Sequence, residues 1–163
     1  PPMMPTPFLI ELHRPDIAGK NKEKAIQAMS ICLSQSMYYT YQVVSTAVDV
    51  VQKNKYHDMI MSTLFEMVNK FPNQVCHKFI LNHIIPSLIN NGIAENAEDW
   101  ELIKKLIYET KPTSCKMALS TLTASQVKDL ITTYEDYKSL LQGTARKLSG
   151  KISPSVLEAI KCH

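Results

Sequence analysis

The feature that most constrains the fold is the stretch from Lys55 to Asn91, where two apolar helical patterns are separated by Phe71-Pro72-Asn73. In both patterns apolar residues recur at intervals of three and four, as on one face of a helix. The break predicts that the two helices lie antiparallel. Two helices alone cannot cover two wide apolar faces, so neighbouring segments are expected to stack on them. The patterns consist of Met59, Leu64, Met67, Val68 and Phe71, and of Val75, Cys76, Phe79, Ile80, Ile84 and Leu88.

The rest of the chain carries further helical patterns. With only four glycines and no alternating runs bounded by Asn-Gly or Asp-Gly turns, it gives little support for strands. We predict an all-α fold of about seven to nine helices, in which antiparallel helical hairpins stack as a short HEAT-like α-solenoid or a compact helical bundle. The expected helices cover 21–35, 37–54, 56–70, 73–90, 97–108, 115–122 and 125–142, with a last one from Pro154 to near Ile160. The expected core comprises Leu64, Val68, Val75, Phe79, Ile80, Ile84, Ile103, Leu106 and Ile131.

Prolines mark particular points along the chain. Residues 1–7 hold four of the nine prolines and are expected to be extended, so we divide the chain into a Pro-rich N-terminal arm (1–19) and a single helical domain (20–163). Apolar residues 8–12 are expected to pack on the first helix, with a short linear motif as the alternative. Pro86 should kink or restart the helix 73–90. Because position 1 is Pro, we expect a domain cut from a longer polypeptide.

Charge and cysteine usage indicate the setting. The net charge of +3 is too small to argue for nucleic acid, although residues 111–163 carry eight basic and four acidic side chains. A solvated helix face is the plainer interpretation, and a phosphate-binding surface is the alternative. No apolar run is long enough to span a bilayer and no signal sequence opens the chain, so we expect an intracellular protein, nuclear or cytoplasmic. Four widely separated cysteines without a CxxC motif suit a reducing compartment: Cys32, Cys76, Cys115 and Cys162.

No catalytic motif stands out. The chain has no GxGxxG, P-loop or HExxH, so we expect no enzyme activity, cofactor, metal or small-molecule substrate. Cys76 and His83 are seven residues apart while His77 is rotated off their face, which favours a structural role over a metal site. His57 with Asp58, and with Asp49 one helix earlier, resembles a base and its orienter, but no nucleophile motif accompanies them.

Two groups of residues are candidates for partner binding. On a helix Tyr38 and Tyr41 share a face while Tyr39 points elsewhere, so at least one ring is expected to meet solvent or a partner; packing in the core or at its edge is the alternative. The basic group would form a stripe if the last helices align, with an exposed Tyr39 or Tyr137 adding a stacking surface for RNA. The candidates are Tyr38, Tyr39, Tyr41, Lys138, Arg146, Lys147 and Lys151.

The segment KFPNQVCHKFILNHIIPSLI, from Lys70 to Ile89, combines an aromatic residue and a proline, a cysteine, and an apolar helix interrupted by proline. This pattern resembles the helical-repeat C-terminal domain of the Fanconi anaemia group E protein. The resemblance implies a nuclear adaptor in a DNA-repair ubiquitin ligase assembly.

The sequence therefore predicts a non-catalytic protein-interaction or scaffold module with protein partners in a larger intracellular, nuclear complex, and neither a membrane nor a small-molecule ligand. The alternative is a helical bundle that reads a phosphorylated peptide or RNA in transcription or RNA processing. Nucleic-acid binding, if present, is expected to be weak, about micromolar or poorer at physiological salt.

Overall fold

The computed structural model describes residues 3–148 and 150–161, and its secondary structure is helical, with no β-strand in these two ranges. The all-α prediction is confirmed. The chain divides into two compact units, Pro1–Asp99 and Trp100–His163, which we describe separately. Cys162 and the first two prolines of the leader lie outside the described residues. The proposed division into an arm of 1–19 and a domain of 20–163 stays a prediction.

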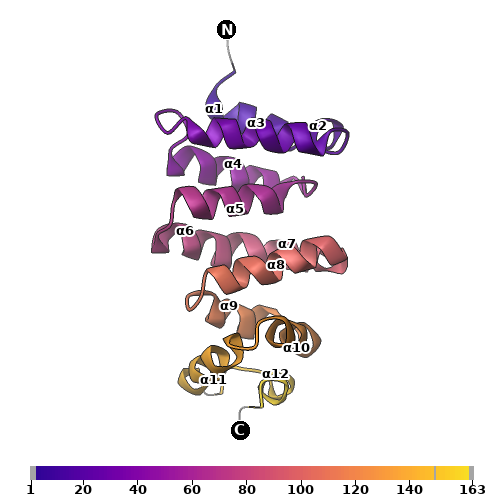
Figure 1. Ribbon diagram of the computed structural model, residues 1–163, viewed down its shortest axis with the longest axis vertical. Coiled ribbons are helices and arrows are strands. Elements are labelled where there is room, and N and C mark those ends of the chain that lie inside the picture. The colour runs from indigo at the N-terminus through magenta and orange to yellow at the C-terminus, as the bar shows by residue number, and fades with distance from the viewer. Residues whose placement is uncertain (1–2, 149, 162–163) are drawn as a thin grey trace. The chain divides into compact units, whose positions relative to one another are not determined.

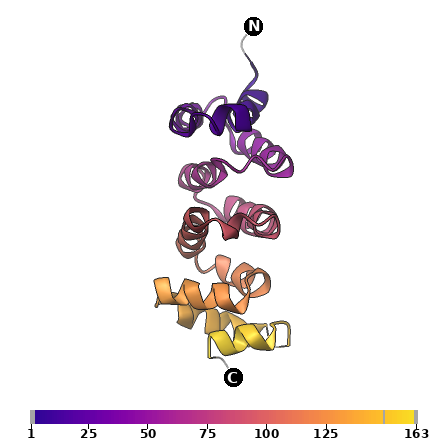
Figure 2. The same ribbon diagram turned by 90° about the vertical axis from the view of Figure 1, so that its right-hand side faces the viewer.

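The first unit is built of helices that lie in successive layers (Figure 1). Seen nearly end-on, these helices lie in two stacked columns (Figure 2). α1 packs against α4, and α3 packs against α5. The elements are α1 (Pro5–Leu12), α2 (Pro15–Ala18), α3 (Lys22–Ser34), α4 (Tyr41–Lys53), α5 (Ile60–Lys70), α6 (Gln74–Phe79), the π-helical turn η1 (Ile80–Ile84), α7 (Ile85–Asn90) and the 3-10 turn η2 (Ile93–Glu95).

The expectation of an extended leader is wrong from Pro5 onward, where α1 begins. A proline in the first turn of a helix leaves no bond unmade, because that amide would have no partner inside the helix. Leu9 is fully buried. At the end of the helix the buried His13 places Nδ1 2.7 Å from the Leu9 carbonyl oxygen and Nε2 2.6 Å from the Thr63 hydroxyl, which joins α1 to α5.

The predicted break between the central helices is present. α5 ends at Lys70, and the Asn73 side chain accepts a hydrogen bond of 3.0 Å from the Cys76 amide to cap α6. Gly92 follows α7 and has a positive φ of 87°, the left-handed conformation that glycine adopts readily where a helix ends.

Pro86 restarts the second central helix, as expected, and the structure shows how. Immediately before it, the Ile85 amide donates to the Ile80 carbonyl, so this turn spans five residues instead of four. Proline has no amide hydrogen, and its ring collides with the preceding turn of an α-helix. The wider π-turn makes room for that ring.

The second unit contains most of α8 (Ala97–Glu109), followed by α9 (Ser114–Thr121), α10 (Ala124–Thr133), α11 (Tyr137–Lys147) and α12 (Pro154–Ala159). Within it α9 packs on α11, and α10 packs on α12. The predicted single helix from 125 to 142 is wrong, because α10 ends before Tyr134 and α11 continues through Gly143. Thr123 caps α10, in a reciprocal capping box with Gln126.

The predicted core is correct for most residues. Five of its members are fully buried: Leu64, Ile80, Ile84, Ile103 and Leu106. Val68, Phe79 and Ile131 are only partly buried. The prediction that Val75 belongs to the core is wrong, because this residue is 65% exposed in the first turn of α6. Cys76 is the buried residue of that turn.

Candidate protein-interaction surfaces

An apolar hollow of about 460 Å³ lies beside the start of α1 in the first unit. Its lining carries no charge, and we call it the Met-Tyr groove: Met3, Met4, Pro5, Gln35, Tyr38 and Tyr39. Three of these side chains are open to solvent, with exposed fractions of 54% for Met3, 70% for Met4 and 60% for Tyr38. Met37, at the same turn, is 82% exposed. The sequence did not point to the methionines as site residues, although two of them stand next to each other in the leader and Met37 precedes the tyrosines.

The three tyrosines have different roles. Because α4 begins at Tyr41, Tyr38 and Tyr39 precede the helix, and the predicted common face of Tyr38 and Tyr41 is wrong. Tyr39 is buried, and this burial, together with a hydrogen bond to Cys32, raises the pKa of its hydroxyl. Only Tyr38 presents an exposed ring.

Tyr41 belongs to an aromatic cluster inside the first unit. Its ring meets Phe71 edge-on at 5.6 Å between centroids and Phe79 at 6.4 Å. Its hydroxyl donates to the Val75 carbonyl oxygen at 3.5 Å. These contacts hold α4 against the start of α6, so they account for Tyr41 without a partner.

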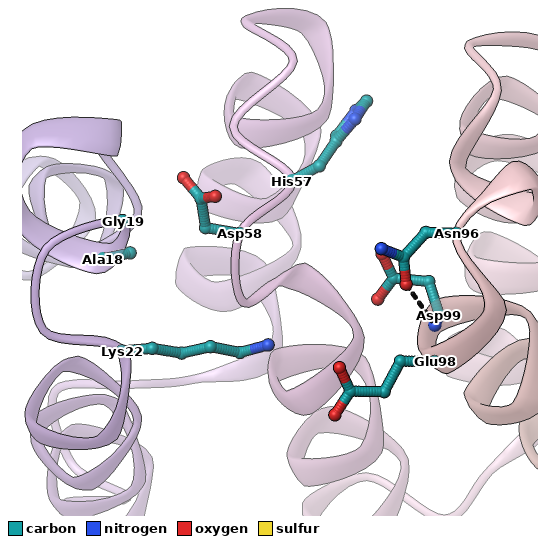
Figure 3. A pocket seen from close by; sticks show the side chains of 8 residues that line it. All are labelled: Ala18, Gly19, Lys22, His57, Asp58, Asn96, Glu98 and Asp99. Carbon is teal, nitrogen blue, oxygen red and sulfur yellow. Dashed lines mark hydrogen bonds between the residues drawn. The ribbon is translucent and has the colours of Figure 1, made fainter.

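A second hollow of the first unit, of about 260 Å³, is polar (Figure 3). Lys22 reaches from the start of α3 toward the side of the hollow that carries the Glu98 and Asp99 carboxylates. The Asp58 carboxylate and the His57 ring point in other directions. Burial lowers the pKa of His57, against the opposing effect of the Asp99 and Asp58 charges. Burial likewise raises the pKa of Asp99, with Lys22 acting in the opposite direction.

Asp49 does not orient His57. Asp49 instead contacts His83, at 2.8 Å between Oδ1 and Nε2, and Lys53, at 2.8 Å. The polar hollow is lined by Ala18, Gly19, Lys22, His57, Asp58, Asn96, Glu98 and Asp99, and this lining contains no Ser, Thr or Cys to act as a nucleophile.

The cysteine and histidines of α6 and η1 do not converge. Cys76 is buried with its Sγ 3.8 Å from the Met67 carbonyl oxygen, and burial raises the pKa of this thiol to about 11. His83 is engaged with Asp49. Across residues 3–148 and 150–161, no three His, Cys, Asp or Glu side chains are grouped to hold a metal ion.

One lysine of the second unit belongs to its interior. Lys104 is 2% exposed, and its Nζ lies 2.8 Å from Asp129 Oδ2, 2.8 Å from Glu101 Oε1 and 2.9 Å from Thr133 Oγ1. Asp129 also accepts a 2.7 Å bond from Trp100 Nε1. Burial alone would lower the pKa of Lys104, but the hydrogen bonds from its ammonium to Asp129 and Glu101 raise it.

The basic candidates lie on the surface of the same unit. Arg146, Lys147 and Lys151 are exposed and Lys138 is partly buried. None of the four forms an ion pair with a residue that the structure describes.

The expectation of an exposed Tyr137 ring is wrong. Tyr137 is fully buried, with its hydroxyl 2.7 Å from Ser114 Oγ. Tyr108 and Tyr134 stack on each other at 4.3 Å, and the Lys111 ammonium sits 3.5 Å from the Tyr108 ring centroid. These three tyrosine rings therefore make their contacts within the unit.

Comparison with known proteins gives one family. The family model described as "Symplekin tight junction protein C terminal" matches residues 1–134. No solved structure matches the chain. Nothing in these comparisons supports the resemblance to the Fanconi anaemia group E protein. In the part of the chain that the structure describes, no helix combines the length and the apolar character needed to cross a membrane.

Proposed function

The chain belongs to the symplekin tight junction protein C-terminal family, and from this premise we propose that it is a non-catalytic scaffold module that holds a partner protein within a larger complex. Helical stacks suit this task because their ridges and grooves accept helices or peptides of other proteins. The lining of the polar hollow, where acids and a base lie together, contains no Ser, Thr or Cys.

The observation that carries the proposal is the Met-Tyr groove. Met3, Met4 and Tyr38 expose most of their surface in a unit whose other large apolar side chains are mainly buried. Methionine side chains adapt their shape to the surface they meet, and a tyrosine ring offers a large contact area with a polar end. Both residue types are enriched at protein interfaces.

The uncharged lining of the Met-Tyr groove indicates what kind of segment binds there. We propose that it is the apolar face of an amphipathic helix of the partner. A charged segment would lose its water in this groove and gain no opposite charge, since none of the lining side chains is ionised at neutral pH. An apolar face buries hydrocarbon against the methionines, and Gln35 at the groove offers hydrogen bonds to the polar edge of the helix.

Site-specific photocrosslinking tests the proposal. A photoreactive amino acid replaces Tyr38 in one variant and Val75 in another; Val75 is a matched control because it is 65% exposed in the same unit but outside the groove. We expect one discrete protein adduct in cells from position 38 only. The partner segment identified from that adduct should then bind the purified chain and lose at least about tenfold in affinity with Met4→Asp/Tyr38→Asp, as for an interface hot spot.

The same experiment contains the contrary results. Equal adducts from both positions, or a purified partner that binds Met4→Asp/Tyr38→Asp as tightly as the unaltered chain, would show that the groove is not the docking site. Val75→Asp should leave the affinity unchanged. The nuclear location expected from the sequence stays a prediction, which imaging of the tagged full-length protein tests.

A further inference from the structure

The second unit presents a line of side chains on α11 that differs from the Met-Tyr groove in chemistry. Lys138, Gln142 and Arg146 are spaced by four residues and so follow one face of this helix. We call these three residues the α11 stripe. The two cations at its ends are about 12 Å apart along the helix axis, at a rise of 1.5 Å per residue.

A third cation is brought to the stripe by a bond between helices. Gln142 Nε2 donates to the carbonyl oxygen of Ile160, at the end of α12, at 2.8 Å. Lys161 follows directly, is exposed, and has a positive φ of 51° that ends the helix there. The middle of the stripe therefore lies next to the backbone that carries Lys161.

Helix electrostatics do not account for this arrangement. A cation in the last turn of a helix is stabilised by the helix dipole, which explains Arg146. Lys138 lies in the first turn of α11, where the dipole disfavours a cation, and Lys161 is outside both helices. The nearest acids in sequence are Asp136, Glu135 and Glu158, and none of them forms an ion pair with a described basic residue. Asp136 instead accepts a 2.7 Å hydrogen bond from the Tyr108 hydroxyl.

We propose that the α11 stripe, with Lys161, binds an acidic segment of a partner protein. Opposite charge is the complement of three cations that lack a protein counter-ion among the described residues. An extended chain rises about 3.3 Å per residue, so two carboxylates four residues apart span the same distance as Lys138 and Arg146. Gln142 lies midway between them in sequence and is held to the end of α12 by its bond to Ile160.

Protein is favoured over RNA because the described residues of this unit offer no free aromatic ring on which a base could stack. Single-stranded nucleic acid binds on aromatic platforms beside a basic groove. Here Tyr137 is buried, Tyr108 and Tyr134 cover each other, and Trp100 donates to Asp129 beneath the Lys104 ammonium. The described aromatic residues of the unit are thus buried or packed against other side chains of the unit.

Fluorescence anisotropy on the full chain tests the proposal with three labelled probes of equal length. They are an extended peptide with Glu at alternate positions, the same peptide with Gln in place of Glu, and a single-stranded oligouridine. At low salt we expect binding of the Glu peptide, no binding of the Gln peptide, and weaker binding of the oligouridine. The affinity for the Glu peptide should fall as salt rises, because exposed charges are screened.

Charge-removing variants localise the site. Lys138→Gln/Arg146→Gln should lower the affinity for the Glu peptide by about tenfold, as expected for the loss of two exposed ion pairs. Lys161→Gln should lower the same affinity by a smaller factor. Lys116→Gln/Lys128→Gln removes the same charge from α9 and α10 and should change the affinity less than twofold, with circular dichroism showing that all variants stay folded.

Three results would overturn the proposal. The first is no binding of the Glu peptide by the unaltered chain. The second is equal loss in the two double variants, which would indicate diffuse attraction by net charge. The third is tighter binding of oligouridine than of the Glu peptide with the same dependence on Lys138 and Arg146, which would identify the stripe as an RNA surface.

Discussion

Removing the carboxylate of Asp129 should destabilise the protein more than removing the buried ammonium of Lys104. The two groups are paired, but their surroundings differ. Lys104 has 2% of its side chain exposed, whereas 48% of the Asp129 side chain is exposed. An orphaned Asp129 is therefore hydrated at once, while an orphaned Lys104 keeps its charge inside the protein with only Glu101 and Thr133 as partners.

The magnitudes follow from the bonds that each change breaks. Asp129→Ala removes one charge-assisted hydrogen bond, about 1.5–3 kcal/mol, and a second bond from the Trp100 indole, about 1 kcal/mol. Discounted for the half-exposed carboxylate, the expected loss in the free energy of unfolding is about 2–3 kcal/mol. Lys104→Met keeps most of the apolar volume and removes the buried charge, so its cost should stay below about 1 kcal/mol.

Urea unfolding followed by circular dichroism at pH 7 measures both changes. Glu101→Ala is the matched control, because this carboxylate also contacts Lys104 at 2.8 Å but is 63% exposed; it should cost less than about 1 kcal/mol. The hydrogen bonds from Lys104 and Trp100 lower the pKa of Asp129, so its contribution is present above the unfolded value of about 3.9 and is lost as pH falls through the lower folded pKa. A Lys104→Met protein that loses as much stability as Asp129→Ala would refute this reasoning.

Four further changes are expected to have defined effects on stability in the same assay. Tyr137→Phe should cost about 1 kcal/mol by removing the 2.7 Å bond to Ser114 Oγ, which keeps its bond to the Ile107 carbonyl, and a neutral result would contradict the Tyr137 bond. Asn73→Ala should cost about 1 kcal/mol through loss of the cap of α6, and Asn73→Asp, which keeps the acceptor, should restore it. Phe79→Ala should cost about 2 kcal/mol, below the 3–5 kcal/mol of a fully buried ring, because Phe79 is partly exposed. Burial lowers the pKa of His13, so its contribution is present above the unfolded value of about 6.5 and lost as pH falls below it; His13→Gln should reduce the decrease in urea midpoint between about pH 7.5 and 5.5, and an unchanged decrease would argue against a neutral His13.

Features set by local chemistry were predictable from the sequence. Phe71-Pro72-Asn73 ends one helix and caps the next because proline and asparagine act on the backbone beside them. Gly92 closes a helix for the same kind of reason, since only its own φ is involved. The start of α8 at Asn96 also follows from a local bond, of 2.9 Å from the Asp99 amide to the Asn96 side chain.

Features set by tertiary partners were not predictable. Residues 134–136 carry no Gly or Pro, so the pattern from 125 to 142 predicted one helix. The chain turns there because Tyr137 is buried against Ser114 while Tyr134 stacks on Tyr108, and both partners are distant in sequence. In a continuous helix these two tyrosines, three residues apart, would share nearly one face, about 60° apart around the axis.

The same limit applied to the candidate surfaces. Three closely spaced tyrosines were expected to expose at least one ring, but the local sequence does not indicate that Tyr39 is buried while Tyr38 is exposed. The methionines of the groove were missed because a leader rich in proline was expected to be extended, whereas Pro5 starts a helix and fixes the residues before it near Tyr38. The α11 stripe depends on the bond between Gln142 and Ile160, which joins residues 18 apart in sequence.

The π-turn at Ile80–Ile84 has a consequence for how this family of sequences can change length. It contains one residue more than an α-helical turn, so the chain here carries an insertion that the helix absorbs without forming a loop. Deleting the exposed Asn82 would restore a regular α-helix and would leave Leu88 facing the core, because five residues of a π-turn advance around the helix axis by about as much as four residues of an α-turn. The same deletion would place the Pro86 ring behind a narrower turn, with which it collides. The extra residue therefore accommodates the proline, and we expect the two to be inherited together.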